Sequence, residues 1–181
     1  MAILAFPASA GVTNDMVVRY YSVGGTTEKS IVRYMRQHPY RGDNGHAYAN
    51  LKHRYTLQVE TEMAGEMCRA KDVELDIDFT MTLPKSSNPA ALTASAEQAF
   101  AGFVSFARKH EEHHRASFIT CGRNFVAKAK RMKAAQCSKL VSDIRALLKK
   151  ADAACEVGER PFDRQQSKAV NGLQLFVRAR R

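Results

Sequence analysis

Two stretches in the first half of the chain alternate strictly between apolar and polar residues, at positions 51–60 and 73–83. A period of two is typical of β-strands that bury one face and leave the other in water. The polar face of the first stretch begins with basic residues and that of the second with acidic residues, which favours pairing between the strands. Since Ala64-Gly65 lies in the connection, we expect the two strands to form an antiparallel hairpin.

Shorter elements are predicted on the N-terminal side of this hairpin, and a loop on its C-terminal side. Residues 17–22 have the pattern of a short strand, and Thr26-Thr27 can cap a helix that runs to about Gln37. His38-Pro39 ends this helix, because the residue before a proline disfavours the helical conformation. A loop over residues 84–89 is expected to end the sheet.

The second half of the chain is predicted to begin with a long helix. Ser95 and Gln98 have the spacing of a capping box, and the helix that follows is expected to run to about Lys133. Apolar residues and histidines recur every three or four positions along it, so they share one face. This stripe contains Phe103, Ala107, His110, His114, Phe118, Cys121 and Phe125.

A second helix is expected at about residues 138–153, before Gly158 and Pro161 interrupt the chain. The order of elements predicts an α+β fold, in which a small β/α/β/β antiparallel sheet layer is followed by the long helix and a second, antiparallel helix. The chain has 181 residues, which is enough for one domain with a core. We expect that single domain to cover residues 11–181.

The segment with the clearest chemical meaning is His110-Glu111-Glu112-His113-His114. His110 and His114 are one helical turn apart, so both imidazoles project from one face and can bind the same zinc ion. Glu111 follows the first ligand, where it can accept a proton from a water molecule that zinc activates. A pairing of His110 with His113 also has a suitable spacing, and two buried histidines held by hydrogen bonds are the structural alternative.

Further segments occur in an order that is typical of a known family. They are Tyr20-Tyr21-Ser22-Val23-Gly24-Gly25, His38-Pro39, Gly65 through Cys68 with the strand to Leu83-Pro84, Phe103 and Phe106, and Cys137 with Leu140. Together with the histidine motif, they make the chain from about Val17 to Gly172 similar to the bacterial predicted secreted zinc-dependent proteases, long catalogued as a domain of unknown function. This resemblance implies a zincin-like fold, His110 and His114 as metal ligands and Glu111 as catalytic base.

The four cysteines are even in number and form no CxxC pair, which favours disulfides over a zinc knot. The family resemblance implies a bond between Cys68 and Cys137. Cys121 and Cys155 remain, and we take them as an additional pair, with free buried thiols as the alternative.

The third metal ligand is where the chain departs from the family pattern. Members tend to end with a tyrosine-aspartate pair followed by a threonine and a histidine-glycine, whereas this chain has Phe162-Asp163 and then Gln166 and Lys168. Because a catalytic zinc site normally has three protein ligands and a water, we expect Asp163 to be the third ligand. The alternatives are Glu156 or Glu159 as the ligand, and an ion pair of Asp163 with Arg160 or Arg164.

The first residues of the chain indicate export. Residues 2–6 are apolar, and Ala8-Ser9-Ala10 fits the small-x-small pattern that precedes a signal-peptidase cut. We interpret residues 1–10 as the remnant of a signal peptide, and disulfides fit the oxidising periplasm or extracellular space. No apolar run approaches the roughly 20 residues that span a membrane.

The formal net charge of +10 raises the question of an anionic partner. The basic residues are spread along the chain, and no nucleic-acid motif accompanies them, so we expect a solvated basic surface and no nucleic-acid partner. The expected function is that of an exported zinc-dependent metallopeptidase acting on peptide or protein substrates. The alternatives are a catalytically degenerate relative that serves as a binding or envelope-associated module, and a basic nucleic-acid binder.

Overall fold

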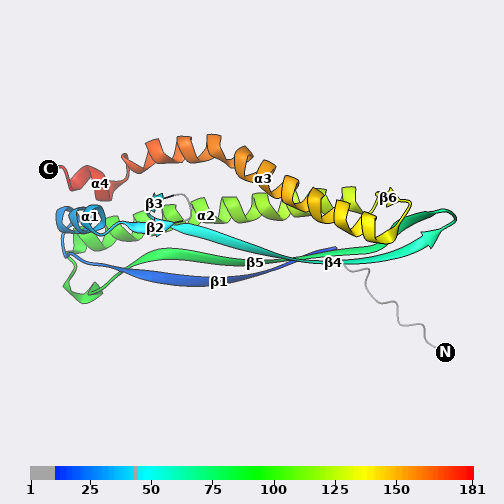
Figure 1. Ribbon diagram of the computed structural model, residues 1–181. Helices are drawn as coiled ribbons and strands as arrows, with labels where there is room; N and C mark the ends of the chain where they lie inside the picture. Colours follow the sequence, from blue (N-terminus) through cyan, green and yellow to red (C-terminus); the bar gives the residue numbers. More distant parts are fainter. Residues whose placement is uncertain (1–10, 43–44) are drawn as a thin grey trace, which may run out of the picture. The chain divides into compact units, whose positions relative to one another are not determined.

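The computed structural model describes residues 11–42 and 45–181, so the expected signal-peptide remnant at residues 1–10 lies outside the described residues. The first half of the chain forms strands with the helix α1 among them, and long helices follow (Figure 1). Their bounds are β1 (Val12–Val23), α1 (Glu28–Gln37), β2 (Tyr40–Gly42), β3 (Gly45–Ala47), β4 (Asn50–Ala64), β5 (Met67–Ser86), the 3₁₀ helix η1 (Pro89–Ala91), α2 (Ala94–Ala129), β6 (Lys133–Ala134), α3 (Cys137–Val170) and α4 (Gln174–Arg178).

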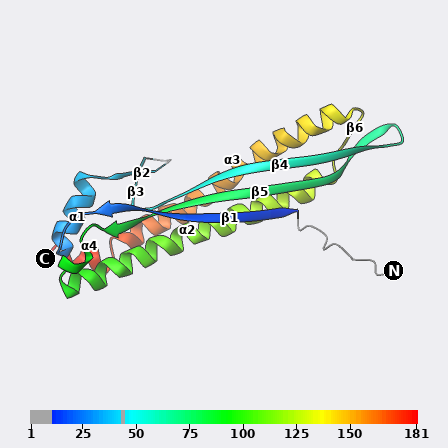
Figure 2. The same ribbon diagram turned by 90° about the horizontal axis from the view of Figure 1, so that it is seen from below.

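The main sheet has β5 between β1 and β4 (Figure 2), and β6 also pairs with β5. The amide of Leu75 donates to the carbonyl of Gly11, and that of Ser87 to the carbonyl of Val23. The residue numbers rise together along the two strands, so β1 runs parallel to β5. The sheet is therefore mixed, and the prediction of an antiparallel sheet is wrong for β1. The direction of β1 relative to β5 is set by the chain between them, which contains α1 and β4. The pattern of a short strand carries no information on its direction.

The predicted hairpin is confirmed and consists of β4 and β5. Its turn is Gly65-Glu66, of which only Gly65 has a positive φ (66°), as in a type II′ turn. Charged side chains face one another across the two strands. The ion pairs are Lys71–Glu60 at 3.2 Å, Arg69–Glu62 at 2.5 Å and Arg54–Asp78 at 2.9 Å. Arg54–Asp78 has the base on β4 and the acid on β5, as predicted, and the other two pairs have the reverse order.

The chain divides into two compact units, and several elements run through both. The first unit comprises the described residues of 1–15 with 54–78 and 118–155. Val73, Leu75 and Ile77 of β5 are fully buried there. At Gly122 of α2 an added Cβ would lie 3.1 Å from both Leu75 Cδ2 and Ile77 Cδ1, so this glycine allows the helix to approach the strand closely.

Both disulfides lie in the first unit, and both predicted pairings are confirmed in the structure. Cys68 on β5 is bonded to Cys137 at the start of α3, with 5.1 Å between their Cα atoms. Cys121 on α2 is bonded to Cys155 on α3, with a Cα separation of 6.3 Å. No cysteine in the described part of the chain is free.

The second unit comprises the described residues of 16–53 with 79–117 and 156–181. Its larger core cluster joins α1, the start of α2 and α4. Phe103 packs edge-on against Phe176 and Tyr48, with ring centroids 5.5 Å and 5.4 Å apart. A smaller cluster joins Met81 and Leu83 of β5 to Ala107 of α2, and this packing fixes the helix one turn before the histidine motif.

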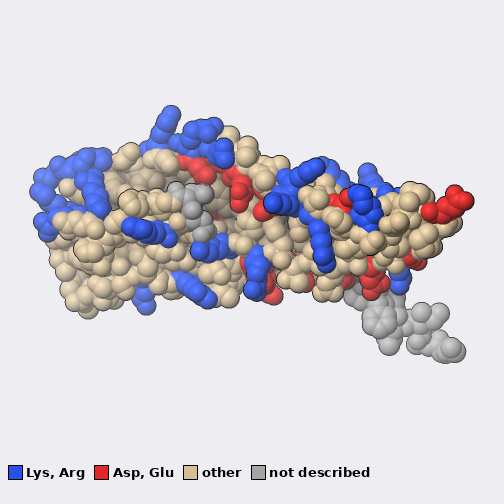
Figure 3. Space-filling model, viewed as in Figure 1, with Lys and Arg blue, Asp and Glu red and all other residues tan. Residues whose placement is uncertain are grey.

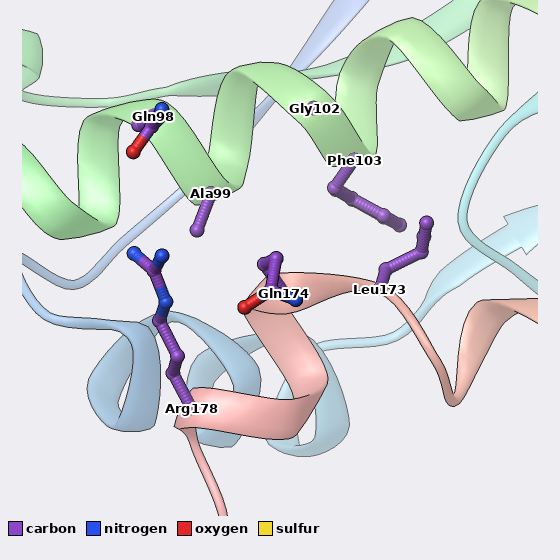
Figure 4. A pocket seen from close by; sticks show the side chains of 7 residues that line it. All are labelled: Gln98, Ala99, Gly102, Phe103, Leu173, Gln174 and Arg178. Atoms are coloured by element: carbon purple, nitrogen blue, oxygen red, sulfur yellow. The ribbon is translucent and has the colours of Figure 1, made fainter.

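A small cavity of about 230 Å³ lies between α2 and α4 in the second unit (Figure 4). Its lining comes from Gln98, Ala99, Gly102, Phe103, Leu173, Gln174 and Arg178. Arg178 is anchored nearby, since its Nη1 donates to Ser95 Oγ at 2.8 Å. None of the residues of the histidine motif lines this cavity.

The predicted helix α1 is confirmed, and the bounds of the two long helices differ from the prediction. Thr27 and Ser30 form a capping box at the start of α1. The cap of α2 is Thr93 and not Ser95, because Thr93 Oγ1 accepts the amide of Ala96 at 3.2 Å. The helix α2 then ends at Ala129, a few residues before the expected position.

The prediction that Gly158 and Pro161 end the second helix is wrong. The helix α3 continues through both residues to Val170. Proline removes one amide donor, the one that would bond the carbonyl four residues earlier at Val157. Val157 is 53% exposed, so water can satisfy that carbonyl and the helix passes through the proline. Within the described residues, no helix is both long and apolar enough to cross a membrane.

Candidate metal centre

Two histidines of α2 face one another across one helical turn in the second unit. The rings of His110 and His114 meet edge-on with centroids 4.5 Å apart, and their Nε2 atoms are separated by 2.9 Å. Both side chains are largely buried, at 22% and 13% exposure. The sequence placed these two nitrogens on one face, and the structure brings them to within the distance at which they can share an ion.

The third vertex of this group comes from α3. Asp163 Oδ1 lies 3.0 Å from His114 Nε2 and 3.5 Å from His110 Nε2. Asp163 therefore faces both histidines, and the structure pairs it with them and not with Arg160 or Arg164. Glu156, an alternative ligand in the sequence analysis, is not part of this triad.

The three donor atoms fit the geometry of a zinc ion. Zinc bonds of about 2.0–2.1 Å with tetrahedral angles separate the ligand atoms by roughly 3.3 Å. The triangle formed by the three atoms has sides of 2.9, 3.0 and 3.5 Å. Two imidazoles and one carboxylate also match the chemical type of known catalytic zinc sites, which take water in the fourth position.

Phe162 fixes the neighbouring rings. It stacks on His113 with centroids 3.7 Å apart and on His110 at 5.0 Å, both nearly parallel. His113 is half exposed, and its Nε2 lies 3.5 Å from a Glu159 oxygen and not in the triad. The alternative pairing of His110 with His113 is therefore not the one that the structure brings together with Asp163.

Glu159 contacts the triad at His114, on the side of the ring opposite to Asp163. Its Oε2 lies 2.9 Å from His114 Nδ1, the ring nitrogen that faces away from Asp163. Its Oε1 accepts a hydrogen bond from Ser117 Oγ at 2.6 Å. From the sequence, Glu159 was expected only as an alternative ligand. Its spacing of four from Asp163 would have placed both on one helix face, but the expected break at Gly158 and Pro161 concealed this signal.

Glu111 is the one charged residue among the fully buried side chains of the described residues, with 4% exposure. Burial and the negative charge of Asp163 raise the pKa of Glu111 to about 8, while the backbone N–H of Leu51 acts in the opposite direction. Burial and the nearby His114 lower the pKa of His110 to about 4, against the opposing effect of Asp163. At neutral pH His110 is therefore uncharged, which is the state in which an imidazole binds a metal.

The chain matches a bacterial protein family over most of its length. Residues 18–170 match the model of a family described as bacterial protein of unknown function, DUF922. The chain belongs to this family. The DUF922 match contains all three residues of the triad together with Glu111 and Glu159, and it agrees with the extent of the resemblance found in the sequence. No curated protein and no solved structure shows significant similarity to this DUF922 chain.

Proposed function

We propose that this chain is an exported zinc-dependent peptidase whose ion is held by His110, His114 and Asp163. The observation that carries the proposal is the triangle of His110 Nε2, His114 Nε2 and Asp163 Oδ1, with sides of 2.9–3.5 Å. Two neutral imidazoles and a carboxylate leave a bound zinc ion with a net positive charge. When bound, zinc supplies Lewis acidity that activates a water molecule and polarises the scissile carbonyl.

In this proposal Glu111 moves the proton. Its carboxylate takes a proton from the attacking water and delivers it to the amine that leaves. Burial and Asp163 raise the pKa of Glu111 to about 8 without a metal, and the positive charge of a bound zinc ion would lower it again, so that the ionised carboxylate is available as the base. During this proton transfer Glu159 holds the ring of His114 in place, and Phe162 holds the ring of His110.

Export is supported by the cysteines. Cys68–Cys137 and Cys121–Cys155 are both bonded, and structural disulfides persist in the periplasm or outside the cell. Lysine and arginine side chains are spread over the face shown in Figure 3, with smaller groups of acidic side chains among them. This distribution fits a solvated basic surface better than a single nucleic-acid groove.

One observation favours a second candidate, a metal-binding module without hydrolytic activity. Glu111 is buried, and the backbone N–H of Leu51 donates to its carboxylate. A carboxylate held in this way has restricted access to an attacking water. A peptidase assay on the zinc-loaded protein separates the two candidates, since both require the metal and only the first requires cleavage.

Metal content of the purified protein tests the shared premise. We expect stoichiometric zinc in the wild type by mass spectrometry and its loss in His114→Ala. The matched control is His113→Ala, which removes a neighbouring imidazole outside the triad and should retain zinc. Loss of zinc in His113→Ala together with retention in His114→Ala would contradict the triad.

A further inference from the structure

The two histidines of the triad differ in what holds their second ring nitrogen. His114 Nδ1 lies 2.9 Å from Glu159 Oε2. His110 Nδ1 is buried and has no hydrogen-bond partner among the described residues. His110 is instead fixed by stacking against Phe162. The orientation of the His114 ring therefore depends on one carboxylate.

Glu159 is itself held in place. Only 13% of its side chain is exposed. Ser117 lies one turn after His113 on α2 and donates its hydroxyl proton to Glu159 Oε1 at 2.6 Å, so both carboxylate oxygens have donors. A buried carboxylate with two fixed donors has a defined rotamer, unlike a surface glutamate.

The geometry points to Glu159 as a positioning residue that holds the His114 ring with Nε2 directed at the metal site. This inference rests on the proposed zinc site. A carboxylate that accepts the Nδ1 proton leaves the lone pair on Nε2, sets the ring plane and makes the imidazole a stronger ligand. Within the triad, the contact of Glu159 is with His114 Nδ1, so Glu159 acts through His114 and is not itself a ligand.

The position of Glu159 follows from the continuity of α3. Glu159 and Asp163 are one turn apart, and they face His114 and His110, which are one turn apart on α2. One turn of α2 and one turn of α3 therefore supply the three proposed ligands and the carboxylate that orients His114. A break at Gly158 or Pro161 would separate these two carboxylates.

Zinc affinity is the first test. The dissociation constant is measured by competition with a chelator for wild type, Glu159→Ala, Glu159→Gln and Ser117→Ala. We expect Glu159→Ala to weaken binding about 10- to 100-fold. Glu159→Gln keeps an acceptor oxygen without the charge and should lose less. Ser117→Ala frees one oxygen of Glu159 and should have a smaller effect still.

Glu112→Ala is the matched control for the loss of a negative charge near the site. Glu112 lies on the same turn of α2 but pairs with Arg115 at 3.7 Å and contacts none of the triad. We expect its zinc affinity to equal that of the wild type. If Glu159→Ala and Glu112→Ala bind zinc equally well, the positioning role is wrong while the zinc site stands. If the wild type binds no zinc, both the site and the role fail.

The Nδ1 proton of His114 gives a readout that a general loss of stability would not reproduce. In proton NMR of the folded protein this N–H should be protected from exchange by Glu159 and give a downfield signal. We expect the signal in wild type, Glu112→Ala and Glu159→Gln, and its loss in Glu159→Ala while the remaining spectrum stays folded. A signal that persists in folded Glu159→Ala would overturn the assignment.

Discussion

At the scale of single residues, neighbouring side chains in the histidine motif have different environments because a helix turns about 100° per residue. His110 and His114 meet Asp163, Glu111 is buried, and Glu112 pairs with Arg115 at the surface. The sequence named His110, His114 and Asp163 as one candidate site, and the structure places these three side chains close together. The sequence was not sufficient to assign Glu159, because its contact depends on the path of the other helix.

Glu111→Gln tests the catalytic role of the buried carboxylate. The amide cannot accept a proton from water, so we expect zinc to be retained and peptide hydrolysis to fall by about 10²- to 10⁴-fold. The measurement is the rate of cleavage of a denatured protein substrate by the zinc-loaded variant. Glu112→Gln is the control and should cleave as the wild type does. A wild-type rate for Glu111→Gln would remove this residue from the mechanism.

Asp163→Ala tests the third ligand. Its carboxylate lies 3.0 Å and 3.5 Å from the two histidine nitrogens, and its removal leaves only two protein ligands. We expect zinc binding to weaken by at least tenfold, of the order found when a contact to a metal site is lost. Circular dichroism should show an intact fold. Arg164→Ala, the next residue along α3, is the control, and equal zinc affinities in the two variants would exclude Asp163 as a ligand.

At the scale of elements, the patterns that repeat over many residues were predicted well. The hairpin of β4 and β5, the capped helix α1 and the buried stripe of α2 follow from period and capping alone. The parallel course of β1 did not follow, because strand direction is decided by the chain between β1 and β5. The continuation of α3 was not predicted either. The low helix propensity of Gly158 and Pro161 is outweighed by the contacts that α3 makes with α2.

Pro161→Ala tests whether α3 is continuous. In a helix that passes through this position, alanine restores the amide bond to the carbonyl of Val157 and removes the clash of the proline ring. We expect the free energy of unfolding to rise by about 1–3 kcal/mol, measured by denaturant titration. Arg160→Ala, at an exposed neighbouring position, should have little effect. A lower stability of Pro161→Ala would mean that the proline conformation is required there.

At the scale of the whole molecule, the disulfides and the candidate metal centre belong to different compact units. Cys68–Cys137 and Cys121–Cys155 lie in the first unit. The triad and Glu159 lie in the second. The pairing of the cysteines was predicted from the family resemblance and from an even count. The division into two units was not predicted, because it depends on contacts between segments far apart in sequence.

Removal of each disulfide should destabilise the fold by roughly 2–4 kcal/mol, because a cross-link restricts the unfolded chain. The cysteines are separated by 69 residues in the first bond and 34 in the second. The double variant Cys68→Ala/Cys137→Ala should therefore lose about 0.6 kcal/mol more than Cys121→Ala/Cys155→Ala. Denaturant titration measures both, after peptide mapping without reductant has verified the bonds. Equal stability of wild type and both double variants would show that the two cross-links do not stabilise the fold.

The unbroken course of α3 makes the spacing within the segment 159–163 as important as the identity of its residues. One inserted residue between Glu159 and Asp163 would turn one carboxylate about 100° away from the other. The insertion would therefore separate Glu159, which supports His114, from the ligand Asp163, although neither side chain would be changed. Substitutions at Arg160 and Arg164, which are exposed, leave the phase of the helix unchanged. We therefore expect related chains that keep this site to vary in composition along this turn and to keep its length.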